Sequence, residues 1–220
     1  YSNGKLYTWK RSSGFGTSFV VNNTLFVSSN AEGLLYLKGN VLKKAPQWDV
    51  FAHDPIRLAK TYNNTVAFIG TASKGFAYYS PFAHPDSCLS YINSSAASYY
   101  QKYHLKSEVQ KYGTNYYIST PGDGCVVVNE EGVLQAVINQ KDGLITNRLH
   151  GVLVDKHGFL WLASNNGISK VDIMSPITYW GVADGLDGNV ESIMRFNGTL
   201  YVGTHNGIYY IDPNNKVKKL

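Results

Sequence analysis

The sequence predicts an all-β fold, a β-propeller with about five four-stranded blades in this chain. One repeated motif carries this prediction: an aromatic residue, an aliphatic residue, a small residue, Ser or Thr, two or three further residues, and then a glycine. The motif occurs five times, at spacings of 42, 49, 44 and 40 residues, and its aromatic anchors are Phe26, Phe68, Tyr117, Trp161 and Tyr201. A period of about 40–45 residues with four short strands per unit is typical of a propeller blade.

Each unit contains its strands in the same order. The first strand is an apolar run before a tight turn, as in IRLAKTY and LHGVLV, and the turns contain the Asn, Gly and Asp residues of short hairpins. The aromatic strand comes second. A glycine anchor then turns the chain into a third, apolar strand, and a weaker fourth strand such as GVLQAVI ends the unit. The glycine anchors are Gly33, Gly75, Gly124, Gly167 and Gly207.

Each aromatic anchor is expected to pack between neighbouring blades, because one blade cannot bury both of its faces alone. On this account, truncating Trp161 to alanine costs about 3–5 kcal/mol.

These units predict one propeller segment over residues 1–220, with blades at 11–46, 54–92, 106–139, 147–183 and 188–220. Residues 1–10 are predicted to be the fourth strand of a preceding or closing blade. The C-terminal KVKKL is also a candidate fourth strand, so a closed five-bladed ring has one strand too many. We therefore expect part of a larger ring of about seven or eight blades. The alternative is a closed five-bladed ring with a loose Lys-rich tail.

Composition narrows the class of protein. The 220 residues are 44% hydrophobic and 16% charged, with a formal net charge of +5 from scattered basic residues, which excludes a disordered chain and argues against nucleic-acid binding. No apolar run reaches the roughly 18 residues of a membrane span. The start, YSNGKLYTWK, has neither an initiator Met nor a signal sequence, and we interpret the chain as a segment of a longer protein. Cys88 and Cys125 allow one disulfide, although buried thiols are expected.

Blade four carries a resemblance to a known family. Its segment DGLITNRLHGVLVDKHGFLWLASNNGISKVD, residues 142–172, resembles the two-component regulator propeller repeat, whose pattern joins Gly-Leu, Asn, an apolar strand, Asp-x-x-Gly, Leu-Trp and a closing Gly. The matching positions are Gly143, Leu144, Asn147, Asp155, Gly158, Leu160, Trp161, Ala163, Ser164, Gly167 and Ile168. Blade five keeps Gly185, Leu186, Gly203, Thr204 and Gly207 but lacks the Asp-x-x-Gly turn and has Tyr201 for Trp. Blades one to three keep only the aromatic residue, the Ser or Thr and the glycine of the repeated motif.

The resemblance implies the periplasmic or extracytoplasmic sensor region of a hybrid two-component histidine kinase, of the Bacteroidetes type. Such regions are typically followed by a sandwich domain, a membrane helix and a kinase, and many respond to oligosaccharides. We therefore expect a ligand-binding domain without catalysis or cofactor of its own. Its expected partners are an oligosaccharide and other propeller blades or a second protomer, with no nucleic acid and no direct membrane contact. The alternatives are a protein-interaction scaffold and a propeller glycosidase or lyase.

The expected binding face is formed by the loops before the first strand and between the second and third strands of each blade. An insertion at residues 81–106, which stretches one repeat to 49 residues, adds tyrosines whose flat apolar faces and polar tips suit sugar rings. A blade-edge strand and a short helix, with the tyrosines packed on the scaffold, is the alternative. The candidate ligand-binding residues are Asn147, Arg148, His150, Asn189, Glu191, His205, Tyr99 and Tyr100.

The sequence offers no catalytic or metal-ligating set. Nucleophile motifs and a phosphate loop are absent, and no two of the six histidines are spaced as metal ligands on one element. Glycoside hydrolysis needs two carboxylates in one cleft. Asp172 and Asp212 instead share one turn position of two blades, while Asp142, Asp184 and Asp187 lie in loops of the expected binding face.

Overall fold

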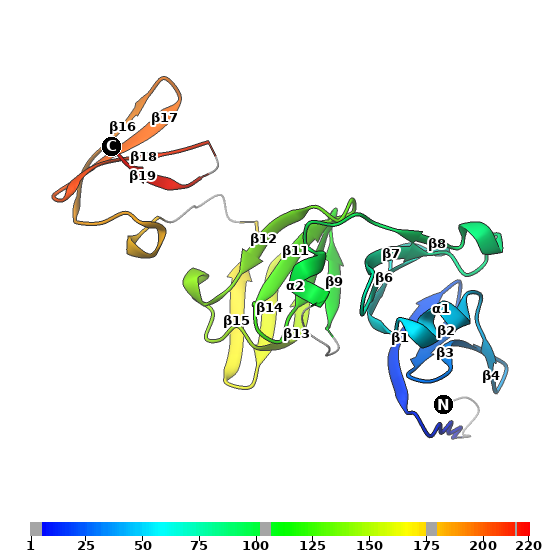
Figure 1. Cartoon of the computed structure of the whole chain (residues 1–220). Helices are drawn as coiled ribbons and strands as arrows, with labels where there is room; N and C mark the ends of the chain where they lie inside the picture. The colour runs from blue at the N-terminus through cyan, green and yellow to red at the C-terminus, as the bar shows by residue number, and fades with distance from the viewer. Residues whose placement is uncertain (1–5, 102–106, 175–179, 214) are drawn as a thin grey trace. The chain divides into compact units, whose positions relative to one another are not determined.

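The computed structural model describes residues 6–101, 107–174, 180–213 and 215–220, and it confirms the all-β fold class (Figure 1). Each repeat of the sequence motif forms one antiparallel sheet, and we number these sheets as blades one to five in chain order. The chain divides into two compact units, Tyr1–Ile173 with blades one to four and Met174–Leu220 with blade five, which we describe separately.

Blades one and two are four-stranded sheets whose strand order follows the sequence. Helix α1 (Trp48–His53) joins them, and a short 3-10 turn (Pro85–Ser87) lies within blade two. Blade one contains β1 (Phe15–Val21), β2 (Thr24–Ser29), β3 (Gly33–Lys38) and β4 (Val41–Lys44). Blade two contains β5 (Ile56–Thr61), β6 (Ala67–Thr71), β7 (Gly75–Tyr79) and β8 (Leu89–Tyr91).

The remaining blades follow the same plan. Helix α2 (Ala97–Gln101) precedes blade three, and the 3-10 turns Gln140–Asp142 and Val182–Asp184 precede blades four and five. Blade three contains β9 (Val109–Tyr112), β10 (Asn115–Ser119), β11 (Cys125–Asn129) and β12 (Leu134–Ile138). Blade four contains β13 (Leu149–Val154), β14 (Phe159–Ser164) and β15 (Gly167–Asp172). Blade five contains β16 (Val190–Phe196), β17 (Thr199–Thr204), β18 (Gly207–Ile211) and β19 (Val217–Lys219).

The fourth strands differ in part from the prediction. Residues 6–10 form no strand: the rings of Tyr7 and Trp9 stack at 6.3 Å, and Trp9 Nε1 donates a hydrogen bond to the Asn40 carbonyl at 3.0 Å. Side-chain contacts with blade one thus replace backbone pairing there, while residues 1–5 lie outside the described residues. In blade four, part of the predicted strand falls at 175–179, also outside them. The KVKKL segment supplies β19, which pairs with β18.

The aromatic anchors of blades one to three lie in the interfaces between successive blades. Phe26 meets Tyr79 of blade two with its ring centroid at 6.2 Å, and Phe68 stacks on Tyr116 of blade three at 3.9 Å. Tyr117 shares a buried cluster with β14 residues of blade four. Each of these anchors therefore faces the next blade, as the sequence predicts for stacked repeats.

Trp161 departs from this pattern. Its side chain is 36% exposed and shares a face of blade four with Leu153 and Ile168, which are 56% and 67% exposed. Among the described residues, no other sheet of the first unit covers this face. The expected cost of about 3–5 kcal/mol for truncating Trp161 requires full burial, and the first unit alone buries this side chain only in part. Tyr201, the anchor of blade five, is half-buried within the second unit.

A carboxylate fixes the turn between β13 and β14. Asp155 Oδ2 accepts a hydrogen bond from Trp161 Nε1 at 2.8 Å, and its Oδ1 accepts from the backbone N–H groups of His157 and Phe159 at 2.8 and 3.1 Å. The bond from Trp161, followed by the two backbone bonds, lowers the pKa of Asp155 below its ordinary value. The ionised carboxylate is therefore the form that this turn favours.

We expect Asp155→Asn to reduce the stability of blade four near neutral pH. Because the pKa is depressed in the folded state, the carboxylate stabilises the fold above the unfolded pKa, and this contribution is lost as pH falls through the folded pKa. The measurement is urea unfolding of the wild type and the variant at pH 7 and at about pH 2. A stability difference that stays the same at both values contradicts this role.

Candidate ligand-binding site at the inner-strand bulges

The first strand of four blades contains a β-bulge near its start. In blade two, Ile56 pairs with Thr71 and Leu58 pairs with Gly70, which leaves Arg57 without a partner in the ladder. The registers of β1, β13 and β16 shift at the corresponding place, and the residues skipped in β13 and β16 are His150 and Glu191. Bulges re-aim side chains and are common next to binding sites.

Blade three has a related arrangement at the start of β9. Glu108 donates its backbone N–H to Ser119 Oγ at 3.1 Å, and its carbonyl accepts from Ser119 N at 3.0 Å. Glu108 therefore occupies the position in blade three that the residues skipped by the bulges occupy in the other blades. We call Arg57, Glu108 and His150, from neighbouring first strands of the first unit, the bulge residues.

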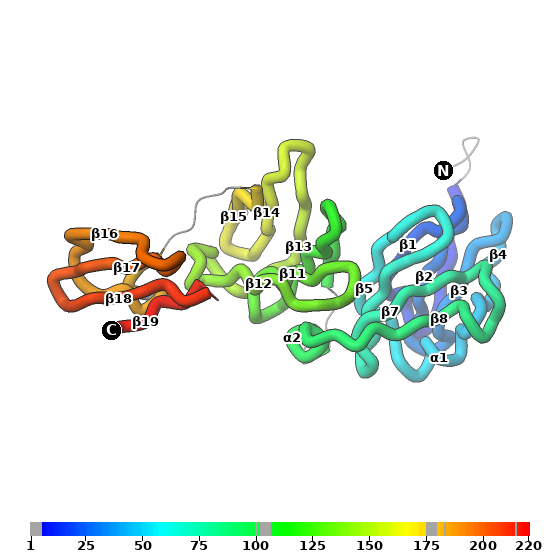
Figure 2. Tube along the Cα trace, turned by 90° about the horizontal axis from the view of Figure 1, so that it is seen from above, coloured from blue at the N-terminus to red at the C-terminus, as the bar shows by residue number. Residues whose placement is uncertain are grey.

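The first strands that carry these residues lie next to one another. Strand β5 contacts both β1 and β9, and β9 contacts β13. Strands β1 and β5 lie side by side, and their labels are neighbours in Figure 2. Backbone bonds join neighbouring blades near these strand starts: Ser107 N donates to the Arg57 carbonyl at 3.3 Å, and Leu149 N donates to the carbonyl of Thr120, just after β10, at 3.0 Å. The three bulge residues thus lie at the starts of three adjacent strands, one residue on each.

Arg57 and Asp54 each contain a buried polar atom without a hydrogen-bond partner among the described residues. The half-buried side chain of Arg57 contains a buried Nε that has no hydrogen-bond acceptor among the described residues. Asp54, at the end of α1, is 5% exposed; its Oδ1 accepts from Ser73 N at 2.7 Å, but its buried Oδ2 has no donor in the described part of the chain. Buried polar groups are normally paired, so a donor and an acceptor here are available to water or a ligand.

The loop between β6 and β7 is held from two sides at this end of blade two. Asp54 accepts the Ser73 N–H, and Gln101 of α2 donates from Nε2 to the Ser73 carbonyl at 2.5 Å. The insertion predicted to carry tyrosines for binding therefore supports the scaffold at this point. Tyr99 packs against the buried cluster between blades two and three, which matches the alternative interpretation of the insertion. Tyr100 belongs to α2, but its side chain lies outside the described residues.

The predicted residues of blade four have different roles. His150 and Arg148 are exposed, and the Arg148 N–H donates to Thr146 Oγ1 at 3.2 Å. Asn147 instead holds its loop: its Oδ1 accepts from Gln140 N at 2.7 Å, and its carbonyl accepts from Gly124 N at 2.9 Å. His150 and Arg148 are thus open to a ligand, whereas Asn147 supports the backbone.

The predicted residues of blade five lie together within the second unit. His205 Nδ1 is 3.8 Å from Glu191 Oε1, with both side chains largely exposed, and His205 N donates to the Asn189 carbonyl at 3.1 Å. Nearby, Asn206 Nδ2 donates to Asp187 Oδ2 at 3.1 Å. The structure thus brings Asn189, Glu191 and His205 to one end of blade five.

Arg57 and Glu108 are absent from the residues predicted for binding. The signal for them is in the sequence: each is the second residue of its predicted first strand, IRLAKTY or SEVQKY, as His150 is in LHGVLV and Glu191 is in VESIMRF. Aligning the first strands of the repeats and comparing their second residues therefore finds Arg57 and Glu108. Choosing residues by chemical type from the blades that best match the family does not.

Among the described residues, no group of three or more His, Cys, Asp or Glu side chains could hold a metal ion. Cys88 and Cys125 are both free and buried, as expected for thiols, and burial raises the pKa of Cys125 to about 12. In the described part of the chain, no helix has the length and apolar character needed to cross a membrane.

Comparisons with known proteins place the fold among extracellular domains. The extracellular domain of BT3049, described as a hybrid two-component system of B. thetaiotaomicron, superposes with a TM-score of 0.55 at 16% identity, over 92% of this chain and 28% of that structure. The extracellular domain of BT4673 from the same organism, described in one structure as a one-component system and in another as a hybrid two-component system, gives 0.52 at 16% identity, over 94% of this chain and 31% of that structure.

One sequence relative agrees with these structures. A protein of Formosa agariphila named histidine kinase P4 is 35% identical over 80 residues, which is 34% of this chain and 6% of that protein. No model of a protein family matches the chain. The chain thus spans less than a third of each solved domain and a small part of the kinase. The recognition made from blade four is confirmed at this level: the fold is that of extracellular domains from two-component systems, and a histidine kinase is similar in sequence.

Proposed function

We propose that this chain is part of an extracytoplasmic sensory domain of a two-component protein, and that it binds an oligosaccharide without catalysis of its own. The observation that carries the proposal is the placement of Arg57 and His150 by bulges, and of Glu108 by its backbone bonds to Ser119, at equivalent places on three adjacent first strands. The fold shared with extracellular domains of two-component systems supports the sensory role and the location.

The chemistry of the bulge residues suits a polyhydroxylated ligand. An arginine donates, a carboxylate accepts, and a neutral imidazole does both, so a set of sugar hydroxyls finds both kinds of partner. The buried Arg57 Nε and Asp54 Oδ2 add one donor and one acceptor that the described residues leave unmet. Because a site built to pair hydroxyls rejects ligands that lack them, this set also provides selectivity.

On this proposal, ligand binding is signalled by a change in how neighbouring blades or protomers pack against one another. A ligand that bridges several first strands binds more tightly to one arrangement of neighbouring blades or protomers than to another. That difference in affinity biases the assembly and, through it, a kinase elsewhere in the protein. The partners proposed are therefore an oligosaccharide and either further propeller blades or a second protomer.

A thermal-melt screen of the chain against plant and host oligosaccharides tests the proposal, with glycan products assayed in the same wells. A ligand that binds only the folded state raises the melting temperature by mass action. We expect at least one oligosaccharide to raise it without being consumed. Turnover of a glycan would instead support the glycosidase or lyase, and no shift with any glycan would contradict oligosaccharide sensing.

The bulge residues should determine the affinity for that oligosaccharide. We expect His150→Ala and Glu108→Gln each to weaken its binding about tenfold or more, because the first removes a hydrogen-bonding ring at the ligand and the second replaces a charged acceptor with a neutral amide. Both side chains are exposed, so the folded chain should be preserved. The control is His157→Ala, an exposed histidine in the turn at the other end of β13. Calorimetric titration that finds equal affinities for all four proteins would rule out this site.

One observation favours a second candidate, a protein-interaction scaffold. Within the second unit, Met194 and Phe196 lie on one face of β16 and are 61% and 59% exposed, which places two large apolar side chains side by side. Exposed apolar patches often mark interaction sites. Binding of a polypeptide that is lost on Phe196→Ala but kept on His150→Ala would support the scaffold over the oligosaccharide sensor.

A further inference from the structure

A pocket of about 620 Å³ lies between blades one and two. Its lining comes from the starts and ends of β2, β3 and β4, from Ala45 and Pro46, and from Pro81 and Phe82 after β7. The volume falls within the roughly 300–1,000 Å³ of typical small-molecule sites. Thr24 and Lys38 border the turns of blade one at the opposite end of β1 from its bulge. The pocket is therefore separate from the bulge residues.

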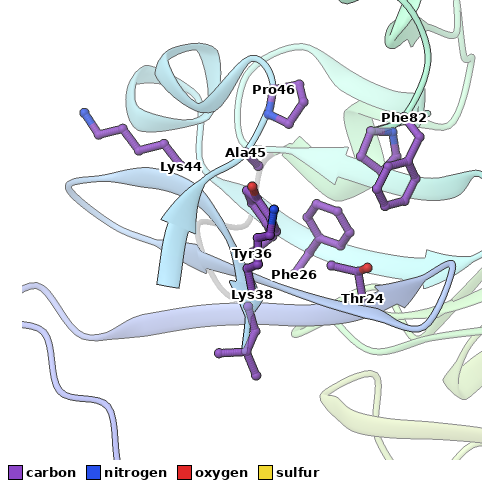
Figure 3. A pocket seen from close by; sticks show the side chains of 10 residues that line it. Thr24, Phe26, Tyr36, Lys38, Lys44, Ala45, Pro46 and Phe82 are labelled. Atoms are coloured by element: carbon purple, nitrogen blue, oxygen red, sulfur yellow. The ribbon is translucent and has the colours of Figure 1, made fainter. Parts of the chain in front are cut away.

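Aromatic rings form the interior of this pocket. Phe26 is 1% exposed, and its ring centroid lies 6.2 Å from Phe82 and 6.0 Å from Tyr36. Figure 3 shows Phe26 at the centre, Phe82 opposite it, and Tyr36 with Lys38 along the other side. Phe82 is 54% exposed, so one apolar ring remains open to an incoming ring. Tyr36 and Thr24 add hydroxyl groups at the edge.

The charged residues that line the pocket are all basic. None of the ten lining residues is acidic, and two are lysines. Lys44 is already engaged, since its Nζ lies 3.3 Å from the centroid of the Trp48 ring and points away from the pocket centre in Figure 3. Lys38 forms no ion pair with any residue that the structure describes. An exposed ammonium beside apolar rings favours an anion attached to a flat or apolar ring.

We propose that this pocket binds a carboxylate-bearing six-membered ring, with the ring against the exposed side of Phe82 and the carboxylate on Lys38. This chemistry has two sources, an aromatic carboxylate and a uronate sugar, which share the ring and the charge. The rings exclude water on one side, so the ion pair with Lys38 is screened less than a fully exposed pair. The site rests on its own lining and does not depend on the proposed function of the bulge residues.

Titration calorimetry of the intact chain with 4-hydroxybenzoate and with glucuronate tests the proposal. We expect at least one of them to bind, and we expect its uncharged counterpart, 4-hydroxybenzyl alcohol or glucose, to bind at least about tenfold more weakly. Binding should weaken as salt is added. The two acids distinguish the sources: binding of 4-hydroxybenzoate alone identifies an aromatic carboxylate, and binding of glucuronate alone identifies a uronate.

Two variants with matched controls locate the binding. Lys38→Gln and Phe82→Ala should each reduce the affinity about tenfold or more, whereas Lys156→Gln and Phe196→Ala, at an exposed lysine and an exposed phenylalanine outside the pocket, should leave it unchanged. His150→Ala should also leave it unchanged, which separates this site from the bulge residues. The proposal is overturned if neither acid binds, if the neutral rings bind as well, or if Lys38→Gln and Phe82→Ala have no effect.

Discussion

Phe68→Ala should lower the free energy of unfolding by about 3–5 kcal/mol. Phe68 is fully buried, stacks on Tyr116 of blade three at 3.9 Å and meets Phe76 of its own blade at 5.2 Å. Its removal leaves a cavity in the interface that joins blades two and three, and the rigid sheets on either side limit how far the site collapses. Urea unfolding followed by circular dichroism gives the change in the free energy of unfolding.

The matched control for this variant is Phe82→Ala. Phe82 belongs to the same blade but is 54% exposed, so its truncation should cost less than about 1 kcal/mol. Amide hydrogen exchange should place the loss of protection from Phe68→Ala in β6 and β10. Equal losses of stability from the two variants would mean that the anchors do not hold the blades together.

Gly33→Ala should destabilise blade one by about 2–5 kcal/mol. Gly33 has a φ of +74°, a conformation that residues with a Cβ rarely adopt, and an added Cβ would overlap the Trp48 carbonyl oxygen of α1. Because the obstacle is helix backbone rather than a flexible side chain, α1 must shift away from β3 to relieve it. Urea unfolding again measures the change.

Gly39→Ala separates the backbone strain of a positive φ from the overlap of the added Cβ with α1. Gly39 also has a positive φ, +59°, but an added Cβ there would meet no atom within 4 Å. Its replacement should therefore cost only the backbone strain of about 1–2 kcal/mol. If Gly33→Ala lowers the free energy of unfolding no more than Gly39→Ala does, the close approach of α1 to Gly33 does not contribute to the cost of the substitution.

The sequence was sufficient to predict the sheets because local and repeated signals agree. All five glycine anchors have positive φ, between +74° and +142°, as the turn after the aromatic strand requires. Phe26, Phe68 and Tyr117 are buried because each faces a following blade within the first unit. Both features depend on geometry that recurs in every repeat, so a single sequence contains five copies of the signal.

Other features depend on particular neighbours and were not predictable in the same way. Trp161 has the best family match of the anchors, yet its exposure depends on what covers one face of blade four. The bulge that presents Arg57 arises from a shift in strand register, which hydrophobic alternation does not reveal. The pocket depends on Phe82, a residue of the irregular segment after β7 that reaches back to blade one. Long-range placement, rather than local preference, determines the exposure of Trp161 and the pocket, whereas the bulge is a feature of strand register that recurs in four blades.

Amide hydrogen exchange with and without the oligosaccharide that most raises the melting temperature is the decisive test of the proposed ligand site. We expect added protection at the starts of β5, β9 and β13, around Arg57, Glu108 and His150, together with the loop at Ser73 that Asp54 holds. Protection confined to other parts of the chain, or no oligosaccharide that binds at all, would contradict the assignment of these adjacent first strands as the ligand-binding site.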